Sequence, residues 1–364
     1  MGPDSIRPVS SREHLRNHTP ASLAALWPDL GLTPAQARRV VARLVGQDRD
    51  SLDGVVGLPR RAASALLGRG DTRRLNVVDR RSSLVDPFVK YLFQSDDGHR
   101  IETVRIPLER PRFSVCVSSQ VGCGLACSFC ETGRLGFSRN LEAWEMVEQV
   151  LAVRREATDR PVAGVVFQGQ GEPLQNYDNV MRAADILRDP CGGRIRGDRI
   201  TISTVGFPAL ILRFTDERRP YRLMLSLTSA CQAKRERLLP IAGRQPLPEL
   251  AEALRRHARL RGEPVNLAWV LMAGINTQPE EARAVRRLFP DVRIRMSVID
   301  VNDPRGQFSR ADAGERAGFL SALAENGIGF VRRYSGGPDI HAACGMLASL
   351  ARGGAMQHAP AAAG

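Results

Sequence analysis

Short apolar runs alternate with stretches of helical periodicity along most of the chain. The runs are "FSVCVSS", "VAGVVFQG", "RITISTV", "YRLMLSLT", "VNLAWVLMA", "VRIRMSVID" and "IGFVRR", and helical patterns such as residues 142–156 and 310–325 lie between them. Such alternation predicts a parallel β-sheet covered by helices. Six or seven strand–helix units in roughly 230 residues are fewer than the eight of a closed barrel. We therefore predict an α/β fold in which residues 113–345 form an incomplete, open (β/α) barrel.

Two smaller units precede this barrel in the predicted organisation. Residues 1–74 are predicted to form an N-terminal helical module, in which Thr33 caps a helix that begins with Pro34. Residues 75–112 are predicted to form a β connector, because "FVKYLFQ" and "IETVRIP" flank the Asp-Gly turn of "SDDGH". Residues 346–364 lack a core-forming pattern and are predicted to be a disordered tail.

The composition is that of a globular chain with excess positive charge. The 364 residues are 43% hydrophobic, but no apolar run is long enough to span a membrane, and the N-terminus carries charges where a secretory signal needs an apolar core. We therefore expect a cytoplasmic protein without a membrane partner. The 52 basic residues exceed the 39 acidic ones, for a net charge of +13, which favours a polyanionic partner such as RNA. All basic residues except Lys90 and Lys234 are arginines, so a compositional bias is an alternative explanation of the excess. Arg38, Arg39 and Arg43 near one helix face fit either phosphate contacts or a solvated surface.

Three of the seven cysteines, Cys123, Cys127 and Cys130, stand in CxxxCxxC spacing. Seven unevenly spaced cysteines are too few for a secreted disulfide scaffold, so metal binding or catalysis is favoured. A structural zinc ion needs four ligands, and no fourth Cys or His lies near this loop. A cubane iron–sulfur cluster on three cysteines instead leaves one iron open to a ligand from solution, with Phe129 as an apolar shield. Free thiols in a loop are the alternative interpretation.

Two further features occur at predicted strands. The motif "GQGEP", from Gly169 to Pro173, follows the second barrel strand, where glycines permit close backbone approach to a ligand and Glu172 can accept an ammonium group. An ordinary turn would also explain this loop. Cys116 lies within the first strand in "VCVSSQVGC", and Cys344 lies near the C-terminus in "PDIHAACGMLA". Each cysteine alone is also typical of a buried structural thiol.

Taken together, these motifs resemble one enzyme family. "RIETVRIP", "CVSSQVGC", "GFSRNL", "GEPLQNYDNV", "TISTVG" and "AACG" occur in this order in the RlmN family of radical S-adenosylmethionine (SAM) RNA methyltransferases, which act on C2 of adenine. The related Cfr group acts on C8. The resemblance covers about residues 30–350 and implies a radical SAM partial barrel. Cys191 and Cys231 match nothing in the family pattern and are interpreted as structural.

The resemblance also implies a mechanism. A 4Fe–4S cluster would be held by Cys123, Cys127 and Cys130. Cys344 would take a methyl group from one SAM, and a radical made from a second SAM would activate this methyl group for addition to adenine. Glu102 would remove the ring proton from the resulting enzyme–RNA crosslink. Cys116 would then attack the sulfur of Cys344, which releases the methylated RNA and leaves a disulfide.

The family's SAM contacts carry over to seven positions near strand ends, namely Gly171, Glu172, Ser203, Ser226, Leu227, Thr228 and Asn302. The resemblance further implies an external electron donor such as flavodoxin or ferredoxin, an rRNA or tRNA substrate, and a monomer. Three stretches depart from the family pattern: "SLTS" stands for "SLHA", "IDVND" for "IPWNP" and "GGPDIHAAC" for "RGDDIDAAC". Because these stretches border the expected pocket, the choices between C2 and C8, between rRNA and tRNA, and of another RNA target stay open.

Two other classes of protein share some of these features. A radical SAM enzyme acting on a peptide or small molecule would have no reason to place Cys116 and Cys344 in these sequence contexts. An RNA-binding protein with a structural metal would need a fourth ligand near the cysteine loop. Metal and sulfide content would separate this last class from the enzymes.

Overall fold

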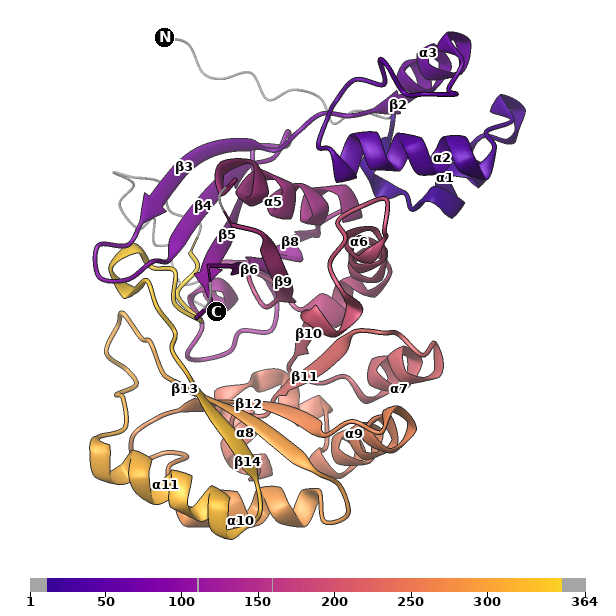
Figure 1. The fold of residues 1–364 in the computed structure, drawn as a ribbon. Coiled ribbons are helices and arrows are strands. Elements are labelled where there is room, and N and C mark those ends of the chain that lie inside the picture. Colours follow the sequence, from indigo (N-terminus) through magenta and orange to yellow (C-terminus); the bar gives the residue numbers. More distant parts are fainter. Residues whose placement is uncertain (1–11, 110, 159, 349–364) are drawn as a thin grey trace, which may run out of the picture.

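One ten-stranded sheet forms the centre of the molecule (Figure 1). The computed structural model describes residues 12–109, 111–158 and 160–348. The strand order is β14-β13-β12-β11-β10-β9-β6-β5-β4-β3. The parallel strands are β6 (Phe113–Val117), β9 (Val162–Phe167), β10 (Ile200–Thr204), β11 (Arg222–Ser226), β12 (Val265–Leu271), β13 (Ile294–Asp300) and β14 (Gly329–Arg333). The antiparallel strands are β3 (Asn76–Ser82), β4 (Val89–Gln94) and β5 (Arg100–Pro107).

Each of the seven predicted barrel runs contains one parallel strand, so the predicted α/β fold is confirmed. Within the described part of the chain, β3 and β14 form the two edges of the sheet and do not pair with each other. The barrel is therefore open, as predicted.

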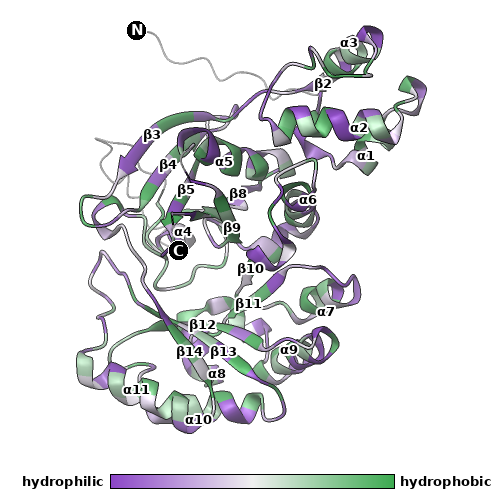
Figure 2. Ribbon diagram, viewed as in Figure 1, coloured by the Kyte–Doolittle hydropathy of each residue, from purple (hydrophilic) through white to green (hydrophobic). Residues whose placement is uncertain are grey.

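Six longer helices cover the outer face of the parallel strands. They are α5 (Ala143–Glu156), α6 (Tyr177–Arg188), α7 (Pro208–Asp216), α9 (Leu247–Arg261), α10 (Pro279–Leu288) and α11 (Ala313–Glu325). Their apolar residues are buried together with those of the strands in one continuous core, and Figure 2 shows this hydrophobic material along the strands and helices. Burying each large apolar side chain contributes about 1.5–3 kcal/mol, which favours the helix-on-sheet packing.

The predicted β connector is continuous with the barrel sheet. Its strands β4 and β5 form an antiparallel hairpin around the turn at Gly98, where the backbone has a φ of 82°. β5 pairs in turn with β6, the first strand of the barrel. Residues of the connector and of the barrel therefore share one sheet surface.

A second, two-stranded sheet lies beside the first barrel strand. β7 (Gln120–Cys123) pairs with β8 (Gly136–Asn140) and so closes the cysteine loop at its base. Sequence analysis did not predict these strands. Gly122 is required here, because a Cβ atom at this position would lie 1.9 Å from the carbonyl oxygen of Gly136.

Short helices make up most of the N-terminal segment. They are η1 (Leu15–Asn17), α1 (Pro20–Leu26), η2 (Pro28–Leu30), α2 (Pro34–Val41), η3 (Ala42–Gly46) and α3 (Arg60–Arg69). The predicted cap of α2 is confirmed: the Thr33 side chain accepts from the Gln36 backbone, and the Gln36 side chain accepts from the Thr33 backbone. β1 (Glu13–His14) pairs with β2 (Gly70–Asp71), which joins the two ends of this segment.

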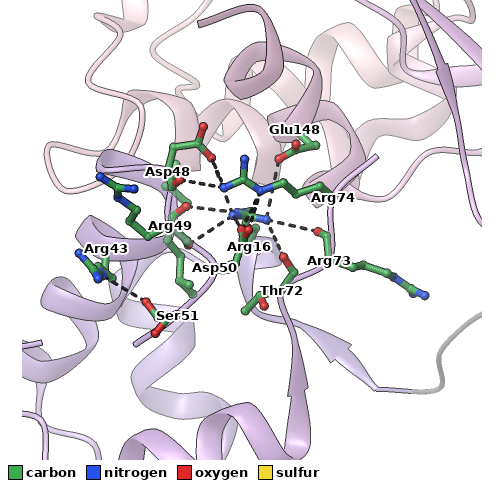
Figure 3. A network of polar contacts seen from close by, with 12 residues as sticks. Arg16, Arg43, Asp48, Arg49, Asp50, Ser51, Thr72, Arg73, Arg74 and Glu148 are labelled. Carbon is green, nitrogen blue, oxygen red and sulfur yellow. Dashed lines mark hydrogen bonds and ion pairs between the residues drawn. The ribbon is translucent and has the colours of Figure 1, made fainter. Parts of the chain in front are cut away.

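A buried arginine joins the N-terminal segment to the barrel (Figure 3). Arg16 is fully buried, and its guanidinium lies 2.5 Å from Asp50 and 3.8 Å from Glu148, a buried residue of α5. It also donates to the carbonyl oxygens of Leu44 and Thr72. Because the guanidinium connects four separate stretches of chain, its removal would leave buried acceptors and carboxylates without this donor.

The packed chain continues past the predicted start of the C-terminal tail. Met346 and Leu347 are buried, so the predicted tail of residues 346–364 begins too early. The Leu347 side chain packs in an apolar cluster with Val104 and Cys116, and its backbone carbonyl accepts a hydrogen bond from Thr132. The rest of that prediction, residues 349–364, lies outside the described residues. Among the described helices, none is both long and apolar enough to cross a membrane.

Candidate active site

A cavity lies at the carboxyl ends of the parallel strands, where open α/β sheets bind ligands. Segments that end or follow β6, β9, β10, β11, β13 and β14 all contribute to its wall. Ten of the predicted site residues line it, namely Cys116, Cys123, Cys127, Cys130, Gly171, Glu172, Ser203, Ser226, Asn302 and Cys344. The fold therefore brings together residues that are far apart in the sequence.

The three-cysteine loop lies on one side of this cavity. Cys123 ends β7, and Cys127 and Cys130 follow in the loop before α4 (Glu131–Arg134). Leu125 and Phe129 pack with these cysteines and with other apolar side chains in a small hydrophobic cluster. Burial, with smaller contributions from the nearby Cys130 thiol and Glu172 carboxyl, raises the pKa of Cys123 to about 11. Thiolates here need a cation or metal to stabilise them.

The donor set around this loop fits an iron–sulfur cluster better than a single ion. Among the described residues, no three His, Cys, Asp or Glu side chains converge to hold one metal ion. A cubane binds each cysteine through a different iron, so its ligands stand farther apart than those of one ion. Arg235 of α8 (Gln232–Leu238) is fully buried, and its Nε and Nη1 atoms have no hydrogen-bond partner. Burial lowers the pKa of this guanidinium to about 10, whereas nearby Cys127 favours its charged form. A buried cation beside the cysteines matches the negative charge of a thiolate-bound cluster.

The glycines of "GQGEP" allow two loops to pack closely. A Cβ atom on Gly169 would lie 2.7 Å from Ser118 Oγ, and one on Gly171 would lie 2.5 Å from Gln120 Cβ. Gly171 also has a φ of 96°, which side chains rarely tolerate. From the sequence, we expected these glycines to let the backbone approach a ligand closely. In the structure, a Cβ atom on either glycine would instead meet Ser118 or Gln120, which follow β6.

Glu172 is held rigidly at the cavity wall. Its carboxylate accepts hydrogen bonds from the backbone N–H groups of Leu174 at 2.9 Å and Val205 at 3.0 Å. The side chain is buried, and burial raises its pKa to about 7. The bonds to two different strand-end loops orient this carboxylate toward the cavity that it lines.

The other predicted SAM contacts divide into two groups. Ser203, Ser226 and Asn302 line the cavity, whereas Leu227 and Thr228 are fully buried and lie outside its lining. Thr228 has a φ of 61°, an unfavourable left-handed conformation for a β-branched residue. This conformation turns the chain sharply after β11, and the Thr228 carbonyl accepts a hydrogen bond from Asn276.

The C-terminal loop docks directly on the cysteine loop. The backbone N–H of Glu131 donates to the carbonyl oxygen of Gly345 at 2.7 Å, and Thr132 Oγ1 donates to that of Leu347 at 2.7 Å. Gly345 has a φ of 85°, and a Cβ atom there would lie 3.1 Å from the Phe129 carbonyl oxygen. These contacts place Cys344, which is exposed, at the cavity beside the three cysteines.

Cys116 faces the same cavity from β6. Its thiol is buried, and burial together with the nearby Cys344 raises its pKa to about 12, although Arg333 acts in the opposite direction. Cys116 and Cys344 are both free thiols in this structure. Cys231 is exposed, Cys191 is half-buried, and both lie outside the cavity lining.

Glu102 is fully buried on β5 and does not line the cavity. Its carboxylate forms an ion pair with Lys90 Nζ at 2.8 Å. Sequence analysis missed Lys90 and Arg235 as site residues. One sequence feature could have pointed to Lys90, because it is one of only two lysines in the chain. No sequence feature distinguished Arg235, since it is one of many arginines.

Comparison with known proteins finds a family model, two relatives and a solved structure that match this chain. Residues 117–289 match the family model of the Radical SAM superfamily. A "Probable RNA methyltransferase" of Myxococcus xanthus is 46% identical over 344 residues, 94% of each chain. A "Probable dual-specificity RNA methyltransferase RlmN" of Moorella thermoacetica is 35% identical over 351 residues, which cover 94% of this chain and 99% of that protein. The crystal structure of a radical SAM methyltransferase from Sphaerobacter thermophilus matches with a TM-score of 0.85 and 34% identity, over 93% of this chain and 100% of that chain.

The open barrel, the cysteine loop at its first strand and the family match define a radical SAM enzyme. The similarity to proteins named as RNA methyltransferases, over nearly the full length of the chain, identifies the subgroup of radical SAM enzymes to which it belongs. The chain belongs to the family of radical SAM RNA methyltransferases that includes RlmN.

Proposed function

We propose that this enzyme methylates C2 of adenine in 23S rRNA, in tRNA or in both. The observation that carries the proposal is the presence of Cys116 and Cys344 in the same cavity as the three-cysteine loop. A radical SAM enzyme without a methyl-carrying cysteine would need neither thiol there. The relatives named dual-specificity RNA methyltransferases support the choice of C2 and of these two RNA classes.

Cofactor binding is divided between two sets of residues in this proposal. A 4Fe–4S cluster is held by Cys123, Cys127 and Cys130, and Arg235 balances its negative charge. SAM is bound by Gly171, Glu172, Ser203, Ser226 and Asn302, with Leu227 and Thr228 shaping the turn beneath it. When bound, the cluster supplies the single electron that starts radical chemistry on SAM.

Cys344 carries the methyl group. Its Sγ thiolate attacks the methyl carbon of one SAM, so that an S–CH3 bond forms and S-adenosylhomocysteine leaves. The exposed side chain and its anchored loop present Sγ to the cavity, which suits a group that must first meet SAM and then RNA. A second SAM would be consumed when its 5′-deoxyadenosyl group takes a hydrogen atom from this S-methyl group and leaves as 5′-deoxyadenosine, with methionine as the other product. Each turnover would therefore use two SAM molecules.

Glu102 and Cys116 complete the reaction. After the methylene carbon has joined adenine, the adduct carries one unpaired electron. The Glu102 carboxylate would accept the proton from the substituted ring carbon, and the unpaired electron would leave to a one-electron acceptor, the oxidised cluster, so that a closed-shell crosslink remains. The Cys116 thiolate then attacks Sγ of Cys344: an S–S bond forms, the S–CH2 bond breaks, and its electron pair takes up a proton to complete the new methyl group. The disulfide must be reduced by two electrons from thiols before the next turnover. We further propose that flavodoxin or ferredoxin is the donor to the cluster, and that the enzyme acts in the cytoplasm as a monomer.

RNA binding is assigned to the barrel mouth and to the N-terminal helical module of residues 1–74, as far as this module is described. Arg60 and Arg61 begin α3 on an exposed surface and could meet phosphates. Arg39 and Arg43 are less suited to this role, because each donates to a carbonyl oxygen of the module's own loop. The net charge of +13 favours a polyanionic substrate overall.

Mass spectrometry of rRNA and tRNA tests the proposal. Cells lacking the gene are complemented with wild type, Cys344→Ala, Cys116→Ala or Cys231→Ser, and adenosine methylated at C2 and at C8 is quantified separately. Wild type and Cys231→Ser restore the C2 signal, because Cys231 lies outside the cavity. Cys344→Ala restores none, and Cys116→Ala accumulates protein joined covalently to RNA. If Cys344→Ala were fully active, methyl transfer through Cys344 would be refuted.

A C8 signal in the same experiment would support the alternative activity of the Cfr group. This second candidate uses the same cysteines, and the departures at Thr228 and in residues 299–303 border the pocket that poses the base. If neither position responds to complementation, the target is another RNA.

A further inference from the structure

The two lysines of this chain occupy similar environments. The chain has 52 basic residues, and only Lys90 and Lys234 are lysines. Lys90 pairs with Glu102 at 2.8 Å, and Lys234 pairs with Glu281 at 3.0 Å; both glutamates are almost or fully buried. A compact ammonium group can approach one carboxylate oxygen where the planar guanidinium fork of arginine would need more room.

Lys90 differs from Lys234 in its position relative to the cavity. Lys90 lies directly opposite Val104 in the β4–β5 ladder, and Val104 lies opposite Cys116 in the β5–β6 ladder. Directly opposed residues share a face and side chains alternate along a strand, so Lys90, Glu102, Val104 and Cys116 project from the same face. Val104 and Cys116 line the cavity on that face. The Lys90–Glu102 pair therefore lies on the same face of the sheet as these lining residues and next to them.

Lys90 also bonds to the loop that carries Cys344. Its Nζ atom donates to the carbonyl oxygen of His341 at 3.3 Å, three residues before Cys344. The side chain is almost fully buried, so this ammonium is shielded from water. One charged group thus contacts both the carboxylate of Glu102 and the backbone of the C-terminal loop.

The charged surroundings of the pair come from four other elements. These groups are Arg81 opposite Lys90 on β3, Cys116 on β6, Glu131 on α4 and His341 in the C-terminal loop. Burial lowers the pKa of His341, which Lys90 lowers further and Glu102 raises. His341 therefore lies within electrostatic range of both members of the pair.

We infer that Lys90 is a positioning residue for the proposed base: it keeps the buried Glu102 carboxylate ionised and ties it to the Cys344 loop. The inference rests on the proposed function, in which Glu102 accepts the ring proton. A buried carboxyl group without a counter-charge favours its neutral form, and a neutral carboxyl cannot accept a proton. Because the same ammonium contacts both groups, it also fixes the position of the Glu102 carboxylate relative to the loop that carries Cys344.

The test is the pH dependence of single-turnover RNA methylation by reconstituted full-length enzyme. Lys90→Met removes the charge while keeping the length of the side chain, so its acid limb moves upward by at least about one pH unit and its rate recovers as the pH rises. Lys90→Arg retains a cation, so its acid limb stays at the wild-type position even where the rate is lower. The matched control is Lys234→Met, which breaks the other lysine–glutamate pair, outside the cavity lining, and leaves the acid limb in place.

Two further measurements separate chemistry from folding. Iron content and the mass of protein methylated on Cys344 report a folded, loaded site before any RNA is added. If Lys90→Met contains as much iron and as much methylated Cys344 as wild type, and its rate has the same pH dependence once both profiles are normalised to their maximal rates, the inference is wrong. Glu102→Gln tests the proposed function separately: wild-type turnover by this variant would remove Glu102 as the base. An inactive Glu102→Gln together with an unshifted Lys90→Met would overturn the role of Lys90 alone.

Discussion

Replacing Gly345 with alanine is predicted to slow methyl transfer to Cys344 while leaving the cysteine loop able to take up iron. The residue follows Cys344 directly and has a φ of 85°, and a Cβ atom there would lie 3.1 Å from the Phe129 carbonyl oxygen. Its own carbonyl oxygen accepts the hydrogen bond from Glu131 that docks the loop. Alanine therefore disturbs the contact that sets the position of the Cys344 thiol.

The expected magnitude follows from the backbone conformation. A left-handed alanine costs about 1–2 kcal/mol relative to glycine. A loop that relaxes to escape this cost reduces the docked population by a factor of roughly 5–30. The contact with Phe129 adds to the effect, because its carbonyl belongs to the cysteine loop and cannot move independently of it.

The assay is the initial rate of methyl incorporation into Cys344 of reconstituted, RNA-free enzyme. Iron and sulfide content are measured on the same samples. The control is Gly262→Ala, at the C-terminal end of α9, where φ is 65° and nothing lies within 4 Å of the added Cβ. This control carries a similar backbone cost far from the cavity. If Gly345→Ala methylated Cys344 as fast as Gly262→Ala did, the docking of the loop would not control the reaction.

Three other predictions concern buried charges. Arg16→Met is expected to lower the free energy of unfolding by about 3–5 kcal/mol in urea titrations, because it leaves buried carboxylates without their cation. Arg69→Met removes one member of an exposed pair and should cost far less, so equal losses for the two variants would refute the network. Burial lowers the pKa of His14 from 6.5 to about 3. The contribution of the neutral His14 side chain to the free energy of unfolding is therefore fully present above about pH 6.5 and is lost as the pH falls toward 3. In His14→Phe, the fall of the free energy of unfolding with decreasing pH should be shallower by about 1.4 kcal/mol per pH unit. An unchanged slope in urea titrations between about pH 4 and 6 would contradict this assignment. Arg235→Met should raise the melting temperature of the cluster-free protein, because an unpaired buried cation is lost, and this gain should shrink or reverse after reconstitution. A gain of the same size in both forms would exclude a contact between the arginine and the cluster.

The features that sequence predicted well depend on neighbouring residues. The strand β9 and the Thr33–Gln36 cap are local patterns, in which apolar periodicity or a side chain three residues away determines the structure. The CxxxCxxC spacing is equally local. These patterns were sufficient to predict the open barrel and the position of the cysteine loop at the first strand.

The features that sequence missed depend on contacts between distant segments. Gly171 is required by its approach to Gln120, and Lys90 meets Glu102 only because β4 and β5 pair in one particular register. Arg235 could not be distinguished from the other arginines before its burial was known. Predicted roles for Leu227, Thr228 and Glu102 came from resemblance, and in the structure these residues are buried and do not line the cavity.

The docking of the C-terminal loop also bears on how the enzyme is made. Protein synthesis produces the cysteine loop early and Cys344 among the last of the cavity residues. A chain interrupted before Cys344 retains the three cysteines and most of the proposed SAM contacts, but it lacks the thiol that we propose receives the methyl group and the residues that cover the cysteine loop. Such a fragment could consume SAM without modifying RNA. Quality control of incomplete chains is therefore more important for this enzyme than for one whose nucleophile lies near its N-terminus.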